Sequence, residues 1–123
     1  MPKLSPVPAL RKDSDFRRVY RKGKSHASPR IVLYVMKRYI TPNGARGVRV
    51  GVSVSAKVGK AVVRNKIRRR LKEIFRMNQD GFRQGFDLVV VARDAAATAE
   101  YAEIERDLFY LAGKLGVTAG ARP

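Results

Sequence analysis

The alternation of apolar and polar residues is clearest at VRVGVSVS, residues 48–55, where valine occupies every second position. A period of two predicts a strand that places its valines on one face and Arg49, Gly51 and Ser53 on the other. RIVLYVMKRYI, residues 30–40, is rich in β-branched and aromatic residues and predicts another strand. Because the turn residues Pro-Asn-Gly lie between the two segments, we expect them to pair as an antiparallel hairpin.

A further strand is predicted at FDLVVVAR, residues 86–93, where the apolar residues are consecutive rather than alternating. This pattern is typical of a strand buried on both faces. The polar segment KSHASP, residues 24–29, is expected to be a loop or at most a very short strand. We therefore expect a sheet of about four strands.

A period near 3.6 residues predicts three helices, at residues 13–22, at residues 59–77 and after Thr98. Asp13 or Ser14 is expected to cap the first helix and Thr98 the last, because short polar side chains accept hydrogen bonds from the first backbone N–H groups. The apolar stripes of the three helices are Phe16, Val19 and Tyr20; Val63, Ile67, Leu71, Ile74 and Phe75; and Tyr101, Ile104, Leu108, Leu111 and Leu115.

These elements predict the order α-β-β(-β)-α-β-α, which is a two-layer α/β (α+β) sandwich around one mixed central sheet. With 123 residues the chain is expected to form a single domain, which we place at residues 10–116. Three prolines among residues 1–9 predict a flexible N-terminal tail. Residues 117–123 are expected to form a flexible C-terminal tail.

The distribution of charge predicts a partner for this domain. The chain carries 27 basic and 10 acidic residues, which give a net charge of +17. Residues 31–72 hold 12 of the bases and no acid, whereas residues 73–123 hold 6 bases and 8 acids. A positive field concentrated in one part of the chain favours a polyanion, either nucleic acid or an anionic membrane surface.

The segment KVGKAVVRNKIRRRLK, residues 57–72, is the most basic part of the chain. On a helix, Arg64, Arg68 and Lys72 form one row at i, i+4 spacing, where like charges destabilise the helix. A solvated face and a membrane-surface helix are alternative interpretations. We prefer nucleic acid, because the strands need the apolar stripe of this helix for a core and leave none for lipid. Five to eight phosphate contacts would make log K fall with log salt with a slope of roughly −4 to −7.

The polar face of the predicted sheet favours RNA over DNA. Gly51 and Ser53 are small and predict a shallow floor rather than a rod that enters a groove. Phe16, Tyr20 and Tyr34 are the aromatic residues nearest to basic sequence. Aromatic rings beside a positive track suit single strands, because any base can stack on them. Core packing is the alternative interpretation for each of the three rings.

The chain offers little for catalysis of its own. It has no cysteine and one histidine, His26, in a polar segment, and its acids are scattered. Acid–base or metal chemistry on phosphodiesters needs several convergent carboxylates or histidines, so we expect no catalytic residue, no metal site and no small-molecule substrate. No apolar run approaches the ~20 residues of a membrane span, and the N-terminus lacks the apolar core of a signal peptide. We expect a cytoplasmic protein without membrane contact.

The segment SAKVGKAVVRNKIRRRLKEIF resembles the signature of the bacterial ribonuclease P protein subunit, in which a Lys-x-Gly-x-Ala-x-x-Arg-Asn element begins an arginine-rich helix. The resemblance extends over about residues 10–115. At Lys66 the family often has arginine, and lysine keeps the charge without the planar fork. The matching residues are Lys57, Gly59, Ala61, Arg64, Asn65, Arg68 and Arg69.

This resemblance implies a subunit of RNase P, the ribonucleoprotein endonuclease that removes the 5′ leader of precursor tRNA to leave the mature 5′ end. The RNase P RNA would carry the active site and its Mg²⁺, and the protein alone would be inactive. The resemblance also implies a left-handed crossover around the basic helix, against the general right-handed rule. The residues implied to contact the catalytic RNA are Lys57, Lys60, Arg64, Asn65, Lys66, Arg68, Arg69 and Lys72. Those implied to contact the leader of precursor tRNA are Phe16, Arg17, Tyr20, Tyr34, Arg49 and Ser53.

Two other functions stay open from the sequence. A structural or ribosomal RNA-binding protein would bind RNA without any effect on the cleavage of precursor tRNA. A stand-alone nuclease would cleave RNA without an RNA cofactor.

Overall fold

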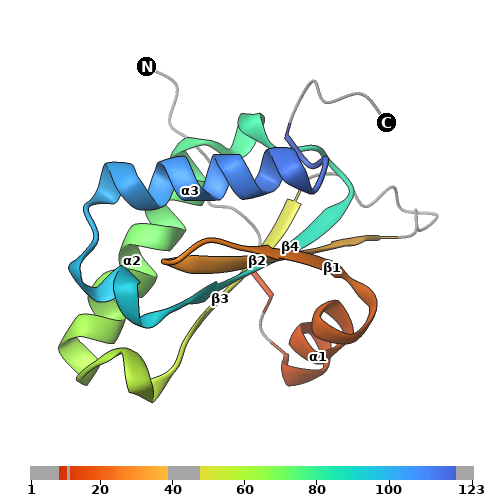
Figure 1. Cartoon of the computed structure of the whole chain (residues 1–123). Coiled ribbons are helices and arrows are strands. Elements are labelled where there is room, and N and C mark those ends of the chain that lie inside the picture. Colours follow the sequence, from red (N-terminus) through yellow and green to blue (C-terminus); the bar gives the residue numbers. More distant parts are fainter. Residues whose placement is uncertain (1–8, 11, 39–47, 119–123) are drawn as a thin grey trace.

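The computed structural model describes residues 9–10, 12–38 and 48–118, and these form a mixed four-stranded sheet with three α-helices (Figure 1). The helices are α1 (Asp13–Lys22), α2 (Ala61–Met77) and α3 (Tyr101–Lys114). The strands are β1 (Lys24–Ala27), β2 (Ile31–Lys37), β3 (Val48–Val54) and β4 (Phe86–Ala92). Short 3-10 turns lie at Ala56–Val58, Gln79–Gly81 and Asp94–Thr98. The predicted α/β sandwich with a mixed sheet of about four strands is confirmed.

Strand β4 lies inside the sheet, in the order β1-β2-β4-β3. It runs antiparallel to β2 and parallel to β3. The hairpin predicted between residues 30–40 and 48–55 is therefore wrong, because each of the two strands pairs with β4 instead. The physical reason is burial: β4 is apolar on both faces, and Leu88, Val89 and Val90 are fully buried at the centre of the sheet. The turn predicted at residues 40–47 lies outside the described residues.

The segment expected as a loop or a very short strand at residues 24–29 contains β1. This strand pairs antiparallel to β2, with Ser25 opposite Tyr34 and His26 opposite Leu33. All four β1 side chains are exposed, so the strand forms the edge of the sheet.

The caps predicted for the first and last helices are wrong by one and two residues. Helix α1 already includes Asp13, and its N-cap position is Lys12. Helix α3 begins after Glu100, whose backbone N–H donates to the Glu103 carboxylate at 2.9 Å. Thr98 instead ends the preceding 3-10 turn. A glutamate three residues into the helix thus satisfies a backbone donor at the cap position.

Helices α2 and α3 cover one face of the sheet and bury the main core against it (Figure 1). The alternating valines of β3 point into this core as predicted. The predicted apolar stripe of α2 is confirmed as well, because Ile67, Leu71, Ile74 and Phe75 are buried and Val63 is partly buried. This stripe fixes the rotation of α2 about its axis and directs its basic residues outward.

Helix α1 packs on the opposite face of the sheet, around the buried side chains of Val19 and Val89 (Figure 1). It contacts β2 and β4, while Ser53 of β3 stays only half-buried. The partial cover leaves room beside α1 over the edge strand β3, and Arg68 of α2 reaches this space from beyond the edge. The hand of the β3–α2–β4 crossover stays a prediction from the family resemblance.

The C-terminal end of the described chain is packed against the domain. Val117 is fully buried, its carbonyl accepts from the Arg83 N–H at 2.8 Å, and Thr118 bridges to Phe82. The packed domain therefore includes these two residues, beyond the boundary expected at residue 116. Within the described residues no helix combines the length and the apolar character that crossing a membrane requires.

Candidate nucleic-acid interface

The outward side of α2 carries positive charge that the fold leaves uncompensated. Arg64, Arg68 and Lys72 follow each other at i, i+4 spacing, as the sequence predicted. Among the described residues, α2 makes one ion pair, between Arg76 Nη2 and Glu73 Oε1 at 2.6 Å. The hydrogen bonds from Arg76 lower the pKa of Glu73, so that Glu73 stays ionised and cancels the charge of Arg76 at neutral pH. The remaining cations of α2 repel each other until an anion approaches.

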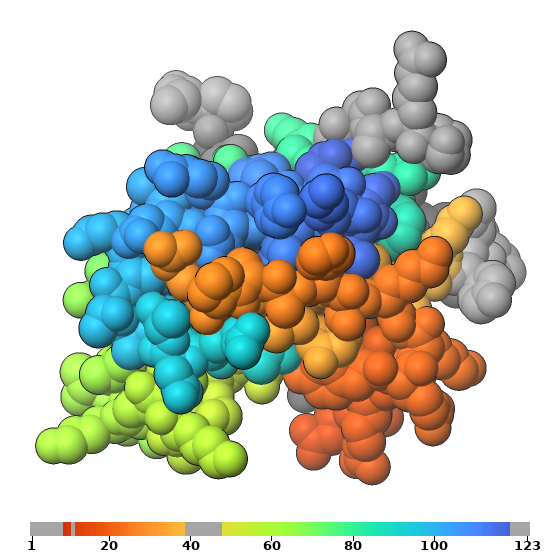
Figure 2. Space-filling view, in the orientation of Figure 1, coloured from red at the N-terminus to blue at the C-terminus, as the bar shows by residue number. Residues whose placement is uncertain are grey.

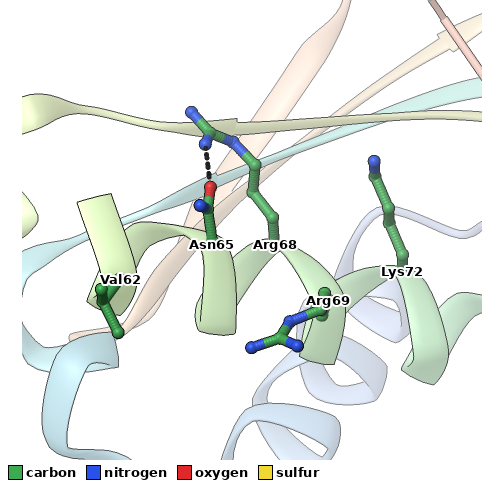
Figure 3. A pocket seen from close by; sticks show the side chains of 5 residues that line it. All are labelled: Val62, Asn65, Arg68, Arg69 and Lys72. Carbon is green, nitrogen blue, oxygen red and sulfur yellow. Dashed lines mark hydrogen bonds between the residues drawn. The ribbon is translucent and has the colours of Figure 1, made fainter.

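Five residues of α2 line a hollow that we call the central groove: Val62, Asn65, Arg68, Arg69 and Lys72 (Figure 3). Its volume is about 490 Å³. Arg68 Nη1 donates to Asn65 Oδ1 at 3.1 Å, which orients the guanidinium before any ligand binds. Arg68 and Lys72 extend to one side of the helix and Arg69 to the other (Figure 3). The spread of the cations suits an extended anion such as a nucleic acid backbone.

A second hollow, which we call the α1 cleft, lies between α1, β3 and α2. Figure 2 shows a notch between α1 and the segment that leads into α2. Its volume is about 400 Å³. The residues that line it are Asp13, Phe16, Arg17, Tyr20, Val52, Ser53, Val54 and Arg68.

Arg68 belongs to both hollows. Besides its bond to Asn65, its Nη2 lies 3.5 Å from the carbonyl oxygen of Val54 at the end of β3. The central groove and the α1 cleft are therefore contiguous parts of one surface, and a single guanidinium lies at their border.

Three aromatic residues predicted for the leader come together beside the α1 cleft. Tyr20 meets Tyr34 edge-on with ring centroids 4.9 Å apart, and Phe16 lies 6.4 Å from Tyr20. Phe16 and Tyr34 also pack against the small apolar cluster of Val19 and its neighbours, while Tyr20 is exposed. Core packing thus applies to Phe16 and Tyr34, whereas the residues that line the α1 cleft are Phe16 and Tyr20. Tyr34 is not a lining residue and is linked to the cleft through its contact with Tyr20.

Arg49 is on the same face of the sheet, but its guanidinium is held by an acid. Its Nε and Nη2 donate to the two carboxylate oxygens of the buried Asp87, at 2.9 and 2.7 Å. These hydrogen bonds raise the pKa of Arg49, against the opposing effect of desolvation. Arg38 adds a second cation, with its Nε 3.4 Å from the same carboxylate. Arg49 is not among the residues that line the α1 cleft, and Asp87 leaves the two N–H groups of its Nη1 and one of its Nη2 for a ligand.

The other predicted RNA-binding residues lie around the start of α2. Lys57 and Lys60 are exposed on either side of Gly59, in a turn where Ser55 Oγ accepts from the Lys57 N–H at 3.2 Å. Gly59 has a φ of +158°, and a Cβ at this position would meet Val63 at 3.3 Å. Arg64 is half-buried, and its Nε has no hydrogen-bond partner among the described residues.

Lys66 lines a third hollow on the flank of α2 that faces α3, which we call the lateral groove. Its other lining residues are Arg69, Arg70, Glu73 and Tyr101. The sequence did not assign to RNA contact Arg70, Glu73 and Tyr101 of this groove, nor Val62 of the central groove and Asp13, Val52 and Val54 of the α1 cleft. Helical spacing alone could have placed Val62 beside Asn65 and Arg69, but the positions of Asp13 and Tyr101 depend on how α1 and α3 pack.

The described residues contain no group of three or more histidine, cysteine, aspartate or glutamate side chains that could hold a metal ion. His26 is exposed on the edge strand β1. The arrangement is that of a binding surface with cations, aromatic rings and a polar floor.

Comparison with known proteins shows which family the chain belongs to. The Ribonuclease P family model matches residues 4–116. The ribonuclease P protein component of Clostridium botulinum (strain 657 / Type Ba4) is 46% identical over 109 residues, which cover 88% of this chain and 94% of the relative. That of Alkaliphilus oremlandii is 38% identical over 118 residues, which cover 96% and 99%.

Solved structures show the same fold. The Staphylococcus aureus RNase P protein superposes with a TM-score of 0.77 at 31% identity, over 88% of this chain and 94% of that chain. The RNase P protein from Thermotoga maritima gives a TM-score of 0.72 at 31% identity, over 83% and 92%. The chain therefore belongs to the ribonuclease P protein family, whose members are subunits of the ribonuclease that processes tRNA 5′ ends and associate with RNase P RNA.

Proposed function

We propose that the chain binds the catalytic RNA of RNase P through α2 and the 5′ leader of precursor tRNA through the α1 cleft. The observation that carries this proposal is the position of Arg68. It lies at the border between a groove lined by uncompensated cations and a cleft lined by aromatic side chains. One continuous surface can thus hold two RNA segments side by side.

For the catalytic RNA, the cations of α2 and of the turn before it supply phosphate contacts. Asn65 orients Arg68 and adds a polar group that can bond a sugar or a base. Pairing these cations with phosphates removes the repulsion along α2, so assembly also stabilises the helix. The residues assigned to this contact are Lys57, Lys60, Arg64, Asn65, Lys66, Arg68, Arg69 and Lys72.

For the leader, the α1 cleft offers rings for stacking and a cation for the backbone. The side chain of Tyr20 is exposed, and the ring of Tyr34 packs against it in an edge-on contact. Stacking on aromatic side chains tolerates any base, which fits a leader whose sequence varies among precursors. The residues assigned to the leader are Phe16, Arg17, Tyr20, Tyr34 and Ser53, with Arg49 contributing through the N–H groups that Asp87 leaves unused.

We place catalysis and its Mg²⁺ in the RNA subunit. In support, the described part of the protein offers no cluster of carboxylates or histidines that could hold the metal or transfer protons. The protein would act by raising the affinity for leader-bearing substrate and by reducing phosphate repulsion between the RNAs. Precursor tRNA as the substrate would place the protein in the cytoplasm.

The test is cleavage of precursor tRNA at low Mg²⁺ with RNase P RNA alone, with protein alone and with both. We expect the pair to cleave much faster than the RNA alone, and the protein alone to be inactive. Cleavage by the protein alone would show that catalysis lies in the protein. Equal rates with and without protein would contradict its proposed role in substrate binding.

A further inference from the structure

The lateral groove lies on the flank of α2 that faces the start of α3. It is lined by Lys66, Arg69, Arg70, Glu73 and Tyr101 and has a volume of about 380 Å³. Three of these five side chains are cations, and the fourth charged residue, Glu73, is an acid.

The acid in the groove is already paired from outside it. Arg76 donates to both carboxylate oxygens of Glu73, at 3.1 and 2.6 Å. Lys66 and Arg69 have no ion pair among the described residues, so the groove keeps a net positive charge. The negative charge of Glu73 is thus compensated by Arg76 and does not compensate the positive charges of Lys66, Arg69 and Arg70.

Arg70 is held in place by the main chain of another element. Its Nη1 donates to the carbonyl oxygen of Ala99 at 2.8 Å, and the side chain is half-buried. This bond fixes the position of a cation in the hollow that Tyr101 also lines. The acceptor is a neutral carbonyl, so the positive charge of Arg70 is not compensated. A preorganised cation loses less side-chain entropy when an anion binds.

Arg69 connects this groove to the surface already described. It lines both the central groove and the lateral groove, as Arg68 lines both the central groove and the α1 cleft. Arg69 leaves the helix on the side opposite to Arg68 and Lys72 (Figure 3). The three hollows therefore form one basic track around α2, from α1 at one end to α3 at the other.

We propose that the phosphodiester backbone of RNase P RNA continues through the lateral groove, with Lys66, Arg69 and Arg70 around a phosphate and the Tyr101 ring against the adjacent nucleotide. This inference rests on the proposed function of α2 and extends the RNA contact to α3. The occupant is RNase P RNA rather than the leader, because the α1 cleft lies at the other end of the track. Three cations around one hollow, one of them held in place, suit the negative charge of a nucleic acid backbone.

The experiment measures the affinity of the full chain for full-length RNase P RNA as a function of salt, together with thermal unfolding of each variant. Arg70→Gln should weaken binding severalfold and make the log–log salt slope shallower by about 1, because one phosphate contact is lost. Arg70→Lys keeps the charge and should restore both values. Glu73→Gln should do the opposite, strengthening binding and steepening the slope, since it removes an acid and frees Arg76.

The matched control is Arg106→Gln, which removes an exposed cation of α3 that lines none of the three hollows. If Arg70→Gln and Arg106→Gln weaken RNA binding equally, Arg70 contributes only to the general positive field of the protein, and the proposed site is overturned. Binding by Arg70→Gln that matches the unaltered chain would overturn it too. If Arg70→Lys loses as much RNA affinity as Arg70→Gln, the role of Arg70 is only to hold the segment at Ala99 in place. The proposed phosphate contact would then be wrong.

The proposed function is tested separately by neutralising Arg64 and Arg68. If that double variant binds weakly while Arg70→Gln binds normally, the RNA contact ends at the central groove. If both variants bind normally, the assignment of α2 to RNase P RNA is itself wrong.

Discussion

The ring of Phe16 lies directly over Gly51, so that a Cβ on residue 51 would come within 2.7 Å of two ring carbons. Gly51 therefore sets how deeply Phe16 sits in the floor of the α1 cleft. We expect Gly51→Ala to push the ring away from β3 and to lower the affinity for leader-bearing precursor tRNA. Overpacking of this kind should also lower the free energy of unfolding by about 1–3 kcal/mol. Affinity for precursor and thermal unfolding measure the two effects.

Gly113→Ala is the matched control for this change. Gly113 lies in α3, and a Cβ there meets no atom within 4 Å. The same substitution should raise the free energy of unfolding by about 0.5–1 kcal/mol and leave RNA binding unchanged. A Gly51→Ala chain that binds precursor normally would show that the depth of Phe16 does not matter for the leader.

Removal of the aromatic rings tests the assignment of the leader. Phe16→Ala and Tyr34→Ala should each weaken binding of precursor tRNA in the complex with RNase P RNA and leave binding of mature tRNA unchanged. A stacking contact is worth about 1–3 kcal/mol per base, which corresponds to a loss of about 5-fold to 150-fold. Dissociation constants for the two tRNA forms give the comparison, and equal losses for both would argue against a leader in the α1 cleft.

The cations of α2 predict a specific dependence on salt. Replacing Arg64 and Arg68 together by glutamine should weaken assembly with RNase P RNA and make the log–log salt slope shallower by about 2. Assembly is measured by titration of the RNA at several salt concentrations. An unchanged slope in the double variant would mean that these two side chains do not contact phosphates.

The ion pair between Arg49 and Asp87 predicts that Arg49 contributes to stability, beside its proposed contact with the leader. Arg49→Ala leaves the buried carboxylate with Arg38 as its remaining arginine partner in an ion pair. We expect the free energy of unfolding to fall by about 2–4 kcal/mol, because a buried charge loses its bidentate partner. Denaturant unfolding measures the change.

The control for Arg49 is the exposed cation Arg21 on α1. Arg21→Ala should leave the free energy of unfolding within about 0.5 kcal/mol of its original value. If Arg49→Ala is as stable as this control yet loses affinity for the leader, Arg49 contributes to RNA binding and not to the stability of the sheet.

The sequence was sufficient for the features that depend on neighbours along the chain. The alternation in β3, the consecutive apolar residues of β4 and the stripe of α2 each place the right side chains in the core. The charge along α2 was readable for the same reason, since residues three and four apart share a helix face. The hairpin failed because turn chemistry is local, whereas the pairing partner of a strand is not. Burial of β4 on both faces decided the order of the sheet.

Sequence by itself determined the elements, the basic face of α2 and the membership of the RNase P protein family. Tertiary structure alone decided which side chains meet across long separations. Arg49 and Asp87 are 38 positions apart and form a buried ion pair. Tyr101 reaches the cations of α2 only because α3 packs beside that helix. The physical reason is that periodicity and charge are properties of a local segment, while the α1 cleft and the lateral groove exist only where separate segments bury their apolar faces against one sheet.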